Sequence, residues 1–136
     1  MSYKLGIIGS RVSTLKGQVW NPKITNPREF VFNHMDQYVT KYGKPSLVIS
    51  GGAKGADTYG IQWAQARGIR TKEYKPDQRL INTTGFRHAA MARNTDIVNT
   101  SDHVVAFWDK KSTGTLDTLN KAKKAKKKVS YFNVGT

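Results

Sequence analysis

Three short loops of this sequence combine glycine with side chains that can bind an anion. They are Gly9-Ser10-Arg11, the stretch from Gly51 to Asp57 (GGAKGAD) with Lys54 inside it, and the stretch from Ser112 to Thr115 (STGT). Glycine lets a backbone approach a ligand closely, and hydroxyl, guanidinium and ammonium groups donate hydrogen bonds to phosphate oxygens. Each loop taken singly is explained as well by a turn in which glycine adopts positive φ and serine or threonine caps a helix. Their convergence would favour phosphate binding.

Two arginines and two aspartates lie in or near these loops. Arg11 follows the first apolar run, and Arg93 precedes Asn94 in a segment of helical pattern. Two converging guanidinium groups would bind an anion bidentately, although a single surface arginine is usually only solvated. Asp57 and Asp109 each have two interpretations. Either carboxylate binds a ribose hydroxyl or acts as a base, or it stabilises local structure such as the first turn of a helix.

Several other chemistries lack the residues that they need. The sequence has no cysteine, and His34, His88 and His103 show no spacing typical of metal ligands, so we predict no metal site and no cofactor. A nucleophile elbow, a Walker loop and a Gly-x-Gly-x-x-Gly fingerprint are all missing, which disfavours P-loop NTPases and nicotinamide dehydrogenases. No apolar run approaches the roughly 18 residues of a membrane span. We therefore expect a soluble, cytoplasmic protein without a membrane partner.

The chain is strongly basic. It carries 23 Lys and Arg against 9 Asp and Glu, a formal net charge of +14 that favours anionic partners such as nucleotides or nucleic acid. Six lysines gather between Lys121 and Lys128. They form either the solvated face of a helix whose apolar stripe is Leu116, Leu119, Ala122 and Ala125, or a set of phosphate contacts to nucleic acid.

Apolar runs and segments of helical pattern alternate along the chain. Short, unalternated runs predict buried strands at 4–9, 45–50, 69–74, 103–108 and 129–132. Helices are predicted at 27–42, 57–67, 85–99 and 114–127. Asn26 should cap the first helix and Gly43 should end it. Residues 75–84 are predicted as a loop, and 12–26, which lack periodicity, as a flap over a site.

This order of strands and helices predicts an α/β fold with one domain over residues 1–136. The expected architecture is Rossmann-like and doubly wound, with a mostly parallel five-stranded sheet and helices on both faces. Parallel strands bring the loops after their carboxyl ends to one edge, where open sheets of this type bind ligands. The three glycine-bearing loops and the helix with Arg93 should therefore meet there.

The same residues resemble the SLOG superfamily. The motifs are Gly-Ser-Arg (9–11) and Ser-Gly-Gly-Ala-Lys-Gly-Ala-Asp (50–57) after strands, Arg-Asn (93–94) in a helix, and Val-Ala-Phe-Trp-Asp (105–109) before Ser-Thr-Gly-Thr (112–115). The resemblance covers nearly the whole chain and is strongest to small single-domain proteins related to YspA and YpsA, with LOG enzymes and the DprA core more distant. It implies a nucleotide pocket lined by Gly9, Ser10, Arg11, Gly51, Gly52, Gly55, Asp57, Arg93, Asn94, Gly114 and Thr115. Further candidate ligand-binding residues from the loops themselves are Lys54, Asp109, Ser112 and Thr113.

Two functions follow for this pocket. The favoured hypothesis is a sensor or sequestering module that binds a nucleotide or nucleotide-derived ligand. The alternative is a LOG-like N-glycosidase or transferase acting on nucleoside monophosphates, with Asp57 and Arg93 as catalytic residues. LOG-type enzymes carry a glutamate where this chain has Thr118, which puts that reaction in doubt. Asp117 should point elsewhere, because one helical residue turns a side chain by about 100°.

A third function is single-stranded nucleic-acid binding of the DprA type, through the lysines between Lys121 and Lys128. The first predicted helix is rich in aromatic residues. Phe30, Phe32 and Tyr38 are therefore candidates for a homo-oligomer interface.

Overall fold

The chain forms a five-stranded sheet in which all neighbouring strands are parallel. The computed structural model describes residues 2–14, 17–18 and 20–136, and the side chains of all of these except 13, 14, 17 and 18. The strand order is β5-β4-β1-β6-β7. The strands are β1 (Lys4–Gly9), β4 (Leu47–Ser50), β5 (Thr71–Glu73), β6 (His103–Trp108) and β7 (Lys128–Asn133). The predicted Rossmann-like α/β fold is confirmed, and the direction of strand addition reverses between β1 and β6.

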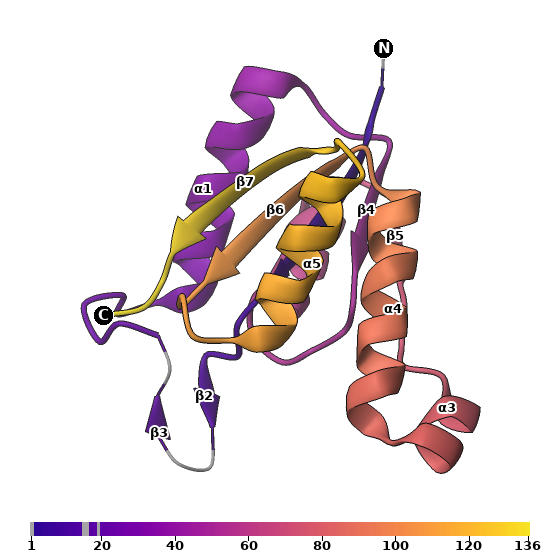
Figure 1. Ribbon diagram of the computed structural model, residues 1–136. Helices are drawn as coiled ribbons and strands as arrows, with labels where there is room; N and C mark the ends of the chain where they lie inside the picture. The colour runs from indigo at the N-terminus through magenta and orange to yellow at the C-terminus, as the bar shows by residue number, and fades with distance from the viewer. Residues whose placement is uncertain (1, 15–16, 19) are drawn as a thin grey trace.

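Helices cover both faces of the sheet (Figure 1). On one face, α1 (Pro27–Tyr42) and α2 (Ala56–Ala66) bury Val31, Met35 and Trp63 against Leu5 and Ile7. The opposite face carries α4 (Phe86–Thr100) and α5 (Thr113–Lys124), whose core residues Ile97 and Leu119 pack with Ile8, Ile49 and Val104. Because successive side chains of a strand point to opposite faces, the unalternated run of β1 supplies both cores.

Capping residues and glycines in the sequence predicted most helix boundaries correctly. The Asn26 side chain accepts a hydrogen bond from Glu29 N (3.1 Å), and Gly43 follows the last turn of α1 with a φ of 88°, as predicted. The last helix was predicted to reach residue 127, but α5 ends at Lys124. Lys126 has a φ of 59°, a left-handed conformation that ends the helix and turns the chain into β7.

The prediction of a loop over residues 75–84 is wrong. The segment contains α3 (Gln78–Thr84), whose first turn is capped by the Asp77 side chain, which accepts from Arg79 N (2.8 Å). This helix buries none of its residues and projects with the start of α4 beyond the carboxyl end of the sheet (Figure 1). A helix that buries no face leaves no apolar period of 3.6 residues in the sequence.

The predicted flap divides into two parts. A hairpin of β2 (Ser13–Thr14) and β3 (Gly17–Gln18) occupies its first half, where 15, 16 and 19 lie outside the described residues. The second half is anchored, because Trp20 Nε1 donates to Ser10 O (3.1 Å) and Asn21 N donates to Val134 O (2.6 Å). Residues 20–26 are therefore part of the packed structure, whereas a covering role for the hairpin stays a prediction.

Two predictions about surface side chains are changed by the packing. Tyr38 is buried within the chain and hydrogen-bonds His103 Nδ1 (2.8 Å), so the prediction that it forms an oligomer interface is wrong. Phe30 and Phe32 are half-buried against the same core. In the lysine-rich helix, Leu119 and Ala122 are buried as the stripe predicts. Leu116 and Ala125, at the two ends of the stripe, are exposed instead. None of the helices in the described part of the chain is long and apolar enough to cross a membrane.

Candidate functional site

A cavity of about 680 Å³ opens at the carboxyl edge of the sheet, beyond the ends of β1, β4 and β6. This volume is in the range of natural small-molecule sites. Every predicted ligand-binding residue except Gly55 lines it. Their roles in binding stay predictions, but the predicted convergence of the three glycine-bearing loops is present. The lining residues predicted from the sequence are Gly9, Ser10, Arg11, Gly51, Gly52, Lys54, Asp57, Arg93, Asn94, Asp109, Ser112, Thr113, Gly114 and Thr115.

Gly55 has a structural role instead. It precedes α2 with a φ of 113°, which side chains rarely tolerate. A Cβ on Gly55 would lie 3.0 Å from the backbone atoms Ser10 O and Val12 N. Glycine at this position therefore brings the N-terminus of α2 against the loop that follows β1.

Asp57 ties two of the loops together. Its Oδ1 accepts from Gly9 N (3.1 Å) and its Oδ2 accepts from Gly51 N (2.9 Å), in the first turn of α2. Burial raises the pKa of Asp57 to about 6, and the opposing effects of Arg93 and of the backbone donors limit that rise. Because both oxygens already accept backbone hydrogen bonds, this arrangement favours the structural interpretation of Asp57 over a basic one.

Arg93 reaches from α4 to the loop after β4. Its Nη1 donates to Gly51 O (2.6 Å) and its Nε donates to Asn94 Oδ1 (3.1 Å). A Cβ on Gly51 would lie 2.8 Å from Arg93 Nη1 and 2.9 Å from Asp57 Oδ2, so glycine is needed between them. Burial lowers the pKa of Arg93, and the nearby Asp57 carboxylate opposes that change. Among the described residues, none accepts from Arg93 Nη2, which leaves donors for an anionic ligand.

The loop after β6 is held by side chains of neighbouring loops. Asp109 Oδ1 accepts from Lys111 N (2.9 Å) and Ser112 N (2.7 Å), and Asp109 N donates to Ser10 Oγ (3.1 Å). The Ser112 side chain caps α5. Asn94 Nδ2 donates to Gly114 O (3.3 Å), which ties α4 to the first turn of α5. As with Asp57, the hydrogen bonds of Asp109 favour its structural interpretation.

The electrostatics of the cavity favour an anion. Two carboxylates line it, those of Asp57 and Asp109, and each accepts two backbone N–H groups. The N-termini of α2 and α5 also face the cavity, where their free N–H groups and helix dipoles attract negative charge. The cationic side chains that line it are Arg11, Lys54, Arg87, Arg93 and Lys111.

Sequence reasoning missed one wall of the cavity, which α4 supplies. Its lining residues are spaced so that they recur on one side of the helix. Apolar residues at such spacing usually belong to a core, so the helix was interpreted from its sequence only through Arg93 and Asn94. Thr118 also lines the cavity, whereas Asp117 does not and instead pairs with Lys121 Nζ (2.8 Å), as its predicted orientation requires. The lining residues of α4 are Phe86, Arg87, Ala90, Met91, Arg93, Asn94 and Ile97.

The remaining candidates do not form a site. His88 is exposed and bonds Thr84 Oγ1 (2.7 Å) through its Nδ1. Trp108 packs edge-on against Tyr131 and donates from Nε1 to Ser112 O (3.0 Å), so its ring has a packing role. Among the residues that the structure describes, no group of three or more His, Asp or Glu side chains is placed to hold a metal ion.

One family model matches part of the chain. Residues 22–80 match the model of YAcAr, the YspA, cpYpsA-related SLOG family. The resemblance to SLOG proteins is confirmed over this segment. The matched segment contains the loop from Gly51 to Asp57, whereas the loops after β1 and β6 lie outside it.

Two solved structures share the fold of this chain. DNA processing protein A (DprA) from Streptococcus pneumoniae superposes with a TM-score of 0.67 and 18% identity over 96% of this chain. DprA from Helicobacter pylori, described for its single-stranded DNA binding mode, superposes with a TM-score of 0.64 and 20% identity over 95% of this chain. The chain spans 50% and 64% of those two chains. No curated protein gives a significant match.

Proposed function

We propose that residues 1–136 form a single domain that binds a phosphate-bearing nucleotide, or a ligand derived from one, as a sensor or sequestering module. The observation that carries this proposal is the cavity itself. There the N-termini of α2 and α5 and the guanidinium of Arg93 converge, and both lining carboxylates are already hydrogen-bonded to backbone N–H groups. A phosphate group at this point would meet several donors.

Binding without turnover fits the site better than glycosidic cleavage. Thr118 lines the cavity where LOG-type enzymes carry a glutamate, and its Oγ1 donates to Gly114 O (3.2 Å). An oxocarbenium-like transition state needs a carboxylate beside the sugar, and threonine supplies none. Asp57 would have to give up backbone hydrogen bonds to serve instead. Asp109 is held through its Oδ1, which accepts from Lys111 N and Ser112 N.

A thermal-shift screen tests this proposal. Wild-type protein is expected to be stabilised by at least one nucleoside mono-, di- or triphosphate, cyclic nucleotide or ADP-ribose-type nucleotide, and chromatography should recover that ligand unchanged. Recovery as free base would establish an N-glycosidase instead. A shift with short single-stranded DNA alone would contradict the proposal.

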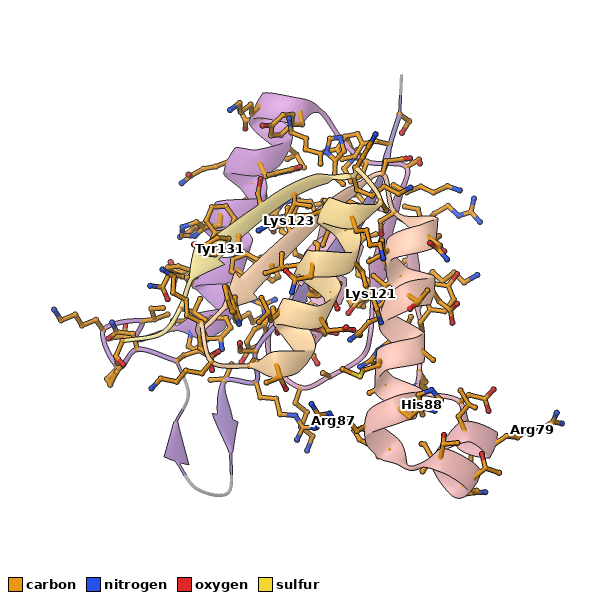
Figure 2. The ribbon with its side chains drawn as sticks, viewed as in Figure 1. Arg79, Arg87, His88, Lys121, Lys123 and Tyr131 are labelled. Atoms are coloured by element: carbon orange, nitrogen blue, oxygen red, sulfur yellow. The ribbon has the colours of Figure 1, made fainter. Side chains whose placement is uncertain are left out.

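Arg93→Gln is expected to raise the dissociation constant of the stabilising nucleotide by about 10- to 100-fold. The variant removes a charge-assisted donor from the cavity, a contact worth about 1.5–3 kcal/mol. Titration calorimetry measures the change. Arg79→Gln removes the same charge from α3, where the side chain lies outside the cavity and points away from it (Figure 2), and should bind like wild type. Equal affinities for both variants would place the phosphate elsewhere.

Single-stranded nucleic acid is the second candidate ligand, favoured by the lysines of α5 and by the described binding mode of the H. pylori protein. Lys121 is engaged in part, because its Nζ donates to Met91 O (2.7 Å) and pairs with Asp117. Lys123, on another side of α5 (Figure 2), Lys124 and Lys126 are exposed. These three, with the half-buried Lys127, are the residues that could follow a phosphate backbone.

A variant in which glutamine replaces Lys123, Lys124, Lys126 and Lys127 tests this alternative. If these lysines contact single-stranded DNA, the slope of log K against log[salt] should flatten by about 3 units, since each contact contributes roughly 0.7. Fluorescence anisotropy with a labelled oligonucleotide at several salt concentrations gives the slope. An unchanged slope would remove these four lysines from any nucleic-acid interface.

A further inference from the structure

The cavity has two chemically different walls. The loops after β1, β4 and β6 and the N-termini of α2 and α5 supply backbone N–H groups, hydroxyls and cations. The opposite wall is mainly apolar and comes from one side of α4 together with Pro76. Its apolar lining residues are Pro76, Phe86, Ala90, Met91 and Ile97.

Phe86 stands out on this apolar wall. Of the described large hydrophobic side chains, only those of Phe86 (57%), Tyr131 (43%) and Leu116 (39%) are exposed. Of these three, Phe86 alone lines the cavity. An exposed aromatic residue on a protein surface needs no explanation by itself, but here its ring borders a cavity whose other wall suits a phosphate.

The backbone places Phe86 at the cavity. It is the first residue of α4, directly after Gly85, which ends α3 and precedes α4 with a φ of 94°. The two helices meet at this corner beyond the carboxyl end of the sheet (Figure 1). Arg87 follows and extends toward the side of α4 that faces α5, whereas Arg79 on α3 points away (Figure 2). The corner therefore presents an aromatic ring and a cation at the cavity.

We propose that the nucleobase of the ligand lies against the α4 wall, with Phe86 as the aromatic face on which it stacks. The inference rests on the proposed function, since a phosphate held by the α2 and α5 N-termini leaves the base of the same ligand to meet the opposite wall. A base is flat and weakly polar on its faces, so an aromatic ring and the apolar side chains of Ala90 and Met91 match it. Phe86 is thus a residue that recognises the base and not the phosphate.

The test compares ligands with and without a base. The dissociation constants of AMP, UMP and ribose 5-phosphate are measured by calorimetry for wild type, Phe86→Ala, Phe86→Trp and Leu116→Ala. Leu116→Ala removes another exposed apolar side chain, outside the cavity, and serves as the matched control. Because Phe86 and Leu116 are both exposed, these variants should fold.

Phe86→Ala is expected to weaken AMP binding by about 5- to 20-fold, near the lower end of the effect known for base–aromatic stacking. UMP should lose less because its single ring offers a smaller stacking face, and ribose 5-phosphate should not change. Phe86→Trp should bind AMP at least as tightly as wild type, and Leu116→Ala should match wild type with all three ligands.

The outcomes separate this inference from the proposed function. An equal loss for AMP and ribose 5-phosphate in Phe86→Ala would show that the side chain positions α4, and would overturn the stacking role. Unchanged AMP binding in that variant would also overturn it, with the nucleotide site intact. Failure of wild type to bind any nucleotide in the screen would overturn the proposed function, and the inference would fall with it.

Discussion

Replacing Trp20 by alanine is expected to lower the free energy of unfolding by about 3–5 kcal/mol, the usual cost of deleting a buried aromatic side chain. Only 1% of Trp20 is exposed. Its ring stacks on Phe107 (centroids 6.4 Å apart) and meets Phe30 edge-on (6.3 Å), and its Nε1 donates to Ser10 O (3.1 Å). One side chain thus joins the end of the predicted flap to the core and to a loop of the cavity.

Trp20→Phe is the matched variant. It keeps an aromatic ring in the core and removes the hydrogen bond to Ser10 O, so its loss should be clearly smaller than that of Trp20→Ala. Urea denaturation of both variants at one pH gives the two values. A loss below about 1 kcal/mol for Trp20→Ala would contradict the anchoring role of residues 20–26.

The stability of the protein relative to Asp57→Asn is expected to fall by about 2.5 kcal/mol as the pH rises from 4 to 7.5. Burial raises the folded-state pKa of Asp57 to about 6 from the ordinary 3.8. Between these values the folded chain holds a proton that the unfolded chain has released. The contribution of Asp57 is therefore largest below pH 3.8 and is lost as the pH rises through 6. The whole loss is about 3 kcal/mol, of which about 2.5 kcal/mol falls between pH 4 and 7.5.

Denaturation curves of wild type and Asp57→Asn at four pH values between 4 and 7.5 measure this change. Their difference cancels the titration of groups common to both proteins, including the general effect of a highly positive chain at low pH. Asp96→Asn removes an exposed carboxylate from α4 and supplies the reference for the altered net charge. A difference that grows with pH would mean that the backbone donors and Arg93 outweigh the burial of the charge.

Strands and most helices could be predicted because their signals are local. The unalternated apolar runs of β1 and β6 were found with their full bounds, and α1 carries its own start and stop in Asn26 and Gly43. Alternation of strands and helices then predicts a parallel sheet, because parallel neighbours need a crossover. The fold class and the edge where the loops meet followed from the sequence for these reasons.

Only the wall of the cavity formed by the loops was predicted, because the residue types in these loops indicate anion binding. Glycine, serine and arginine in βα loops signal an anion site by themselves. Phe86 and Met91 carry no such signal, since apolar residues at helical spacing usually belong to a core. Gly55 was assigned to the ligand because its backbone conformation, which explains the glycine, was unknown.

What the sequence by itself determined is the identity and order of the five strands of the sheet and of the four helices that cover it, and the chemical character of their loops. Tertiary structure alone decided the strand order β5-β4-β1-β6-β7, the burial of Asp57 between Gly9 and Gly51, and the use of α4 as the apolar wall. The reason is the range of the interactions. Periodicity, capping and turn chemistry act between residues a few positions apart, whereas strand pairing, desolvation of a carboxylate and the shape of a cavity depend on segments joined only by folding.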